Sequence, residues 1–190
     1  MKKIAIVLIC MCMLLTSCSS REKVIYSNLD FFDAIFRSDD YVCRTVLDDI
    51  ICSIETKDKE RLLSLFSEKS KADCPELDEQ VEILFNYLSG QLISLGKFIG
   101  LPNTFSTYTE GELVKESHIP TYDINTTDGS YRLTFEYVEI DSNDMGNEGL
   151  VSLYVIRAED DEDTTSAYRM SGEYIPGIHV GVSDDEVNDE

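Results

Sequence analysis

Apolar residues in the first half of the chain recur at the spacing of α-helices. One stripe lies between Val42 and Glu55, a second follows Asp58, and a third ends before Gly90. Residues three or four positions apart share one face of a helix, so each stripe predicts a helix with one buried side. Asp58 is expected to cap the second helix, and Gly90 to end the third. The stripes comprise Val42, Val46, Leu47, Ile50, Ile51 and Ile54; Leu62, Leu63, Leu65 and Phe66; and Leu77, Val81, Leu84, Phe85 and Leu88.

Two further segments of this half carry weaker signals. Leu29–Phe36 has apolar residues at helical spacing and predicts a short helix or a lead-in that packs on the domain. Ser67–Pro75 is polar and predicts a loop.

After Gly90 the apolar period changes from helical to alternating, which predicts β-strands. Gln91–Ile99 is expected to form the first strand and Gly100–Thr109 a loop. Glu112–Ile124 is expected to form the second strand. Pro120 interrupts this strand, which marks it as an edge strand or as the site of a bulge.

The remaining alternation predicts a meander. Thr127–Gly129 is expected to be a hairpin turn, and the next strand begins near Tyr131. Its apolar phase slips in a way that predicts a bulge near Tyr137. Leu150–Ala158 is apolar on both faces and is expected to be central, and Ala167–Val182 to return as the last strand. Helices followed by such strands predict one α+β domain, in which a curved antiparallel sheet wraps its helices.

The N-terminus has the form of a secretory signal. Lys2 and Lys3 precede an apolar run from Ile4 to Leu15, which is too short to span a bilayer as a helix. The next residues complete the sequence Leu15-Thr16-Ser17-Cys18, which is similar to the lipobox of bacterial lipoproteins. The similarity implies that Cys18 receives a diacylglyceryl group and becomes the first mature residue, tethered to the extracytoplasmic face of the cell membrane.

The expected organisation follows from these signals. Residues 1–17 would be the signal peptide, and 18–28 the lipidated cysteine with a flexible spacer. Residues 29–182 would form a single domain, and 183–190 an acidic tail.

Charge excludes one class of partner. The chain has 37 acidic and 16 basic residues, for a formal net charge of −21. A nucleic-acid-binding protein neutralises phosphates with clustered lysine and arginine, and no such cluster occurs in the sequence. Repulsion would also keep the domain off anionic headgroups, so attachment to the membrane is expected to depend on the lipid of Cys18.

The cysteines give little support to a disulfide framework. Beyond Cys18 the mature chain would keep Cys43, Cys52 and Cys74. The first two would lie about 13 Å apart along one helix, beyond bridging distance, so only Cys74 could pair with either. The alternative is that they are small buried apolar residues. No spacing typical of a metal cluster occurs in the sequence.

Several stretches resemble known families. The segment from Ile54 to Ser67 resembles the opening of nuclear-transport-factor-like cone domains, in which an aspartate starts the second helix and leucine and phenylalanine close the narrow end. Leu77–Phe85, Ser130–Leu133 and Gly149-Leu150 are similar to an uncharacterised group of Firmicutes lipoproteins, known as a domain of unknown function. These resemblances imply a cystatin-like cone displayed on a Gram-positive cell surface.

A cone of this kind would hold a pocket between its concave sheet and its helices. His118 is the candidate general base there, and Asp123 or Glu136 could orient it. The alternative is that His118 is a surface or half-buried residue with no catalytic role. Tyr122, Tyr131 and Tyr154 are candidate ligand-binding residues, or else core aromatics whose hydroxyls reach the rim.

Two acidic segments could attract cations. Asp141, Asn143, Asp144 and Glu148 have the oxygen density of a calcium loop, but the stretch departs from the EF-hand template and suffices as a turn. Glu159–Asp163 has five adjacent acids and is expected to be a solvated hairpin tip that binds cations loosely.

The sequence contains no GxSxG, Walker, HExxH or GxGxxG motif, so no cofactor is expected. The leading hypothesis is a lipid-anchored surface domain that binds a small ligand or a partner protein. The alternatives are a pocket enzyme using His118 with a carboxylate, and a structural or interacting lipoprotein with acidic faces.

Overall fold

The computed structural model describes residues 38–98, 103–160 and 175–181. Within these ranges it contains four α-helices and one sheet of seven strands, so the α+β class is confirmed. The helices are α3 (Ser38–Thr56), α4 (Lys59–Leu65), α5 (Glu68–Asp73) and α6 (Leu77–Tyr87). The strands are β1 (Leu92–Phe98), β2 (Asn103–Thr109), β3 (Glu112–Ile119), β4 (Thr121–Thr126), β5 (Gly129–Asp141), β6 (Gly149–Arg157) and β7 (Gly177–Val180).

The three predicted helices correspond to α3, α4 and α6. Asp58 caps α4, because its carboxylate accepts the backbone N–H of Arg61 at 3.0 Å. Gly90 adopts a φ of +83°, the left-handed conformation expected just after a helix. The polar loop predicted after α4 is wrong, since Ser67 instead caps the short helix α5 by accepting the N–H of Ser70.

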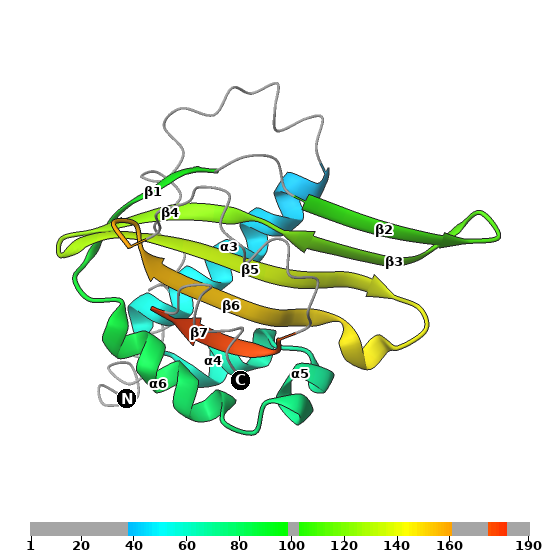
Figure 1. Cartoon of the computed structure of the whole chain (residues 1–190), viewed down its shortest axis with the longest axis horizontal. Helices are drawn as coiled ribbons and strands as arrows, with labels where there is room; N and C mark the ends of the chain where they lie inside the picture. The colour runs from blue at the N-terminus through cyan, green and yellow to red at the C-terminus, as the bar shows by residue number, and fades with distance from the viewer. Residues whose placement is uncertain (1–37, 99–102, 161–174, 182–190) are drawn as a thin grey trace, which may run out of the picture.

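The sheet is organised around the long strand β5. On one side β4 pairs with the first half of β5 and β3 with its second half, so β3 and β4 form one line that Pro120 breaks. β1 lies outside β4, and β2 lies outside β3. On the other side of β5 come β6 and then β7 (Figure 1).

Three strand predictions need correction. Asn103–Thr109, expected within a loop, forms β2 and pairs with β3. Pro120 does not lie in an edge strand, because β3 and β4 each have neighbours on both sides. β7 runs parallel to β6, so the sheet is mixed and the chain does not return through a simple hairpin. The register shift between β3 and β5, which leaves Glu139 as an extra residue of β5, confirms the bulge predicted near Tyr137.

The helices cover one face of the sheet, and the core lies between these two layers. α3 crosses the sheet, and α6 lies beside β7 (Figure 1). Leu133 and Phe135 from β5 are fully buried against Ile50 of α3 and Leu84 of α6 in one cluster. Each such side chain contributes about 1.5–3 kcal/mol by leaving water, so this contact holds the helical layer and the sheet together.

The cysteines and the apolar content of the helices can also be compared with what the sequence predicts. Cys43 and Cys74 are buried, as expected of small apolar residues, and Cys74 is a free thiol. Cys52 is disulfide-bonded, so the expectation that only Cys74 could pair with it is wrong. No helix in the described ranges is both long and apolar enough to cross a membrane.

Candidate functional site

His118 lies in β3 with none of its surface exposed to solvent. Its Nδ1 lies 3.2 Å from the hydroxyl oxygen of Thr104, and its Nε2 lies 2.9 Å from a carboxylate oxygen of Glu139. Both ring nitrogens are therefore engaged in the plane of the imidazole, which fixes the orientation of the ring.

Strand pairing explains why these three residues meet. Thr104 in β2 lies directly opposite His118 in β3, and His118 lies opposite Tyr137 in β5. Glu139 lies two positions after Tyr137, at the point where the pairing between β3 and β5 changes register. A register shift next to this point gives β5 one extra residue, and such bulges commonly redirect a side chain.

Glu116 completes the group. It precedes His118 by two positions in β3, and its carboxylate accepts a hydrogen bond of 2.9 Å from the hydroxyl of Ser106 in β2. One ligand atom from each of Glu116, His118 and Glu139 lies within 4.8 Å of the others. We refer to these three residues as the His118 cluster.

The carboxylates predicted to orient His118 lie elsewhere. Asp123 pairs across the strands with Arg132, at 3.4 Å from its Nε. Glu136 lies opposite Ser152, and alternation along β5 places it on the face opposite to Tyr137 and His118. Burial raises the pKa of Glu136, while the nearby positive charge of Lys115 opposes this shift to a lesser extent.

The three candidate tyrosines do not converge on His118. Tyr122 is buried and stacks on Phe135, with ring centroids 6.3 Å apart. Tyr131 is fully buried, and its hydroxyl lies 3.3 Å from that of Ser89 at the C-terminal end of the helical layer. Tyr154 stacks on His179 with ring centroids 4.5 Å apart. Tyr122 and Tyr131 thus serve as core aromatics, which was the alternative interpretation.

The acidic turn after β5 is closed by its own hydrogen bonds. The Asp141 carboxylate accepts the N–H groups of Asn143 and Asp144, each at 3.2 Å, and the side-chain amide of Asn147 at 2.8 Å. Glu148 accepts the N–H of Asp141 at 3.1 Å. These bonds lower the pKa of Asp141, the bond from Asn147 most of all. Hydrogen bonds within the segment therefore hold it as a turn.

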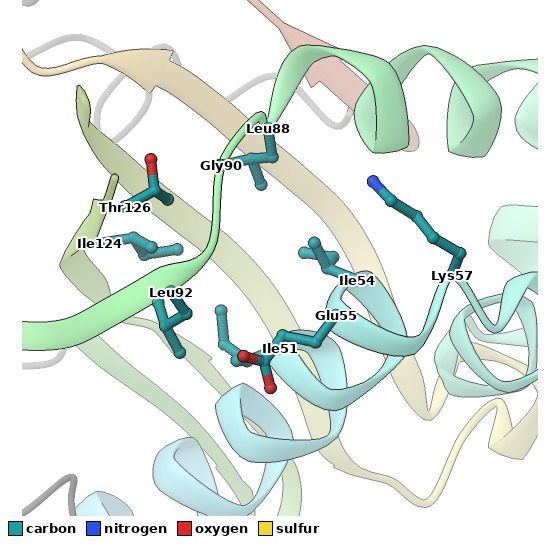
Figure 2. Close-up of a pocket in the computed structure, with 9 residues that line it drawn as sticks. All are labelled: Ile51, Ile54, Glu55, Lys57, Leu88, Gly90, Leu92, Ile124 and Thr126. Atoms are coloured by element: carbon teal, nitrogen blue, oxygen red, sulfur yellow. The ribbon is translucent and has the colours of Figure 1, made fainter. Parts of the chain in front are cut away.

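A small pocket lies between the C-terminal part of α3 and the sheet, with a volume of about 80 Å³. Figure 2 shows Ile51 and Ile54 of α3 on one side, with Leu92 of β1 and Ile124 of β4 on the other. The complete lining is Ile51, Ile54, Glu55, Lys57, Leu88, Gly90, Leu92, Ile124 and Thr126. A pocket between helices and sheet was expected, but none of the predicted site residues lines this one.

The two charged residues of the lining lie at the end of α3. Lys57 has a φ of +52°, and its ammonium group donates to the carbonyl of Phe85 and lies 5.1 Å from the centre of the Phe85 ring. Burial lowers the pKa of Lys57, and the charge of Glu82 opposes this. The pocket therefore combines an apolar interior with a cation whose position is fixed.

Sequence reasoning identified His118 but missed Glu139, Glu116, Thr104 and the pocket. The spacing Glu116-Ser117-His118 was a usable signal, because residues two apart in a strand share a face. Glu139 could not be found in this way, because the sequences of β3 and β5 do not determine which residues of the two strands lie opposite each other. Cys18, Leu29–Phe36 and residues 161–163 of the acidic tip lie outside the described residues.

Comparison with known proteins identifies a family for the chain. No curated protein sequence matches the chain at a significant level. A family model described as "Domain of unknown function (DUF5104)" matches residues 49–158, a region that contains both the pocket and the His118 cluster. Since this match covers more than half of the chain, the protein belongs to the DUF5104 family.

Proposed function

We propose that the chain is a lipid-anchored extracytoplasmic domain that binds a small apolar group in the pocket between α3 and the sheet. The anchor is supported by the N-terminal signal and by the lipobox-like sequence ending at Cys18. The single observation that carries the binding role is the apolar pocket, bordered by Glu55 and Lys57. The finer resemblance to nuclear-transport-factor-like cones and to Firmicutes lipoproteins belongs to the same proposal, and the order of helices and strands supports it.

The size of the pocket limits what can enter it. A water molecule needs roughly 10–15 Å³ of such volume, so about 80 Å³ admits a group of only a few heavy atoms, such as a branched four-carbon chain. Burying four carbon atoms provides about 3 kcal/mol, which corresponds to binding no tighter than roughly millimolar. The natural occupant therefore extends beyond the pocket, either as a larger ligand or as a side chain of a partner protein.

Small probes test this pocket directly. The methyl groups of Ile51, Ile54 and Ile124 would be followed by NMR in the full chain during titration with isopentanol, isovalerate and isopentylamine. We expect at least one probe to shift these methyl signals with a millimolar dissociation constant. A preference for isovalerate would assign recognition to Lys57, and a preference for the amine would assign it to Glu55.

Two neighbouring substitutions provide the matched comparison. Leu92→Phe enlarges a lining residue and is expected to abolish the shifts. Ile93→Phe makes a similar change at the next position of β1, where the side chain is 58% exposed and does not line the pocket, and should leave the shifts intact. Equal responses in the two variants would contradict binding in this pocket.

The anchor has its own test. Intact mass of the membrane-extracted protein should show loss of residues 1–17 and addition of acyl groups at Cys18. Cys18→Ala should abolish both changes. A Cys18→Ala protein processed and retained exactly like the natural chain would exclude lipid attachment at this residue.

A second candidate function is acid–base catalysis, favoured by the 2.9 Å contact between His118 and Glu139. A histidine held by a carboxylate is the usual arrangement of a general base. Glu139 rather than Asp123 or Glu136 would be its orienting group. Any activity found for the chain should fall strongly in Glu139→Gln and remain in Glu136→Gln, whereas equal activities would exclude this mechanism.

A further inference from the structure

We infer that the His118 cluster is a binding site for a divalent transition-metal ion of the zinc type. The ligands would be Nε2 of His118 and one carboxylate oxygen each from Glu116 and Glu139. This inference is independent of the pocket near α3 and of the lipid anchor.

The spacing of the three ligand atoms suits a metal ion. In a tetrahedral zinc site with bonds of about 2.0–2.1 Å, neighbouring ligand atoms lie about 3.3 Å apart. Nε2 of His118 and the Glu139 oxygen are 2.9 Å apart, and all three ligand atoms fall within 4.8 Å. Glutamate side chains have several rotatable bonds, so the two carboxylates can adjust toward this separation when an ion binds.

A second layer of hydrogen bonds supports two of the ligands. Both supporting groups are hydroxyls of β2: Thr104 lies opposite His118, and Ser106 lies opposite Glu116. A hydroxyl can donate or accept, so Thr104 can accept the Nδ1–H of His118 when Nε2 binds a metal. Partners of this kind hold metal-binding histidine and carboxylate side chains in place.

Charge and chemistry select the class of ion. Two carboxylates with a neutral imidazole carry a formal charge of −2, which a divalent cation neutralises. Imidazole favours zinc, iron, nickel and copper over magnesium and calcium, which prefer sites made of oxygen atoms alone. Three protein ligands also leave a fourth position open for water or another small ligand.

The ion can reach the site through Glu139. His118 is fully buried, but the side chain of Glu139 is 35% exposed. The carboxylate therefore extends from the buried nitrogen towards solvent. An arriving cation would bind this oxygen first and His118 next.

The test is metal retention by the full chain without an added histidine tag. After treatment with EDTA, the protein is loaded with Zn²⁺ and then dialysed against a large excess of Mg²⁺ without Zn²⁺, which displaces zinc from weak sites on the acidic surface. We expect one Zn²⁺ to remain per chain. Loss of all Zn²⁺ under these conditions would overturn the inference.

Substitutions assign the site. Glu116→Gln, Glu139→Gln and His118→Gln should each weaken Zn²⁺ binding at least tenfold, and Thr104→Val about tenfold through loss of support for the ring. Two variants serve as controls: His179→Gln removes the other histidine of the chain, and Glu112→Gln removes a charge from an exposed position of β3. Retention that is the same in ligand and control variants would contradict the assignment.

A measurement on the unaltered chain covers the case in which a variant fails to fold. Because the chain has only two histidines, their imidazole nitrogen signals can be assigned by comparison with His179→Gln. Added Zn²⁺ should shift Nε2 of His118 and leave the ring of His179 unchanged. A shift confined to His179, or no shift in either ring, would overturn the proposal.

Discussion

Nε2 of His118 lies 2.9 Å from a carboxylate oxygen of Glu139, although the two residues are 21 positions apart in the sequence and belong to neighbouring strands. The histidine is fully buried and the glutamate is partly exposed. The contact therefore connects the interior of the sheet to its surface, and its energy should be measurable.

A double-mutant cycle would measure this contact. With EDTA present, His118→Gln and Glu139→Gln should show a coupling of about 1–3 kcal/mol in the free energy of unfolding by urea, because each single change leaves a buried or half-buried partner unsatisfied. The pair His118→Gln and Glu136→Gln is the control, since Glu136 lies on the opposite face. Additive effects in both cycles, within about 0.5 kcal/mol, would show that the 2.9 Å contact contributes nothing.

Glu136 should make stability fall as the pH rises. Its pKa in the folded state is raised by burial, so over the interval between its unfolded and folded pKa values the folded chain binds more protons. Glu136→Gln removes this effect, so the variant should gain stability over the natural chain at pH 7 and lose that gain below the normal glutamate range near pH 4. Urea unfolding at pH 7 and pH 3.5 would test this. A gain of the same size at both pH values would contradict burial as the cause.

Asp141 should have the opposite dependence. Hydrogen bonds lower its folded pKa, so its stabilising effect is present above the ordinary aspartate range and is lost as the pH falls through the folded value. Asp141→Asn should destabilise the chain by about 1–3 kcal/mol at pH 7, and the difference should narrow in acid. Asp128→Asn, in the exposed turn before β5, is the matched control. A difference that does not depend on pH would show that the charge of Asp141 is not involved.

Gly177 should tolerate no side chain. Its φ is +112°, and an added Cβ would lie 2.6 Å from the side-chain oxygen of Gln80 and 2.8 Å from the sulfur of Cys74. Gly111 has a φ of +89° with open space around it, so Gly111→Ala reports the backbone cost alone, about 1–2 kcal/mol. We expect Gly177→Ala to lower the free energy of unfolding by about 1–3 kcal/mol more than Gly111→Ala does, as measured by thermal or urea unfolding. Equal losses would mean that α6 can move away from β7 freely.

The parts of the fold with strong periodicity could be predicted from sequence. The stripes of α3 and α6 and the alternation of Tyr131, Leu133 and Phe135 are long enough to specify a helix or a strand. α5 has only six residues, which is too short for a period, and only the cap at Ser67 marks it. β2 was missed because its side chains at Thr104 and Ser106 form hydrogen bonds instead of packing in an apolar stripe.

The candidate site could be predicted only in part, for a related reason. His118 was identifiable because histidine is rare in the chain. Its partner was not, because alternation tells which residues of one strand share a face but not which residue of the next strand lies opposite. The direction of β7 relative to β6 could not be predicted either, because side chains alternate with the same period in parallel and antiparallel strands.

The parallel pairing of β6 and β7 also has a consequence for the edge of the sheet. β7 has four residues and covers one side of β6, and its Ile178 N–H is held at 2.7 Å by the side chain of Gln80 in α6. If this short strand detached, the backbone groups of β6 would become an open template on which a second copy could add a strand. Within the described residues, β7 thus shields the edge of β6 from pairing with a second copy, and the side chain of Gln80 holds β7 against the helical layer.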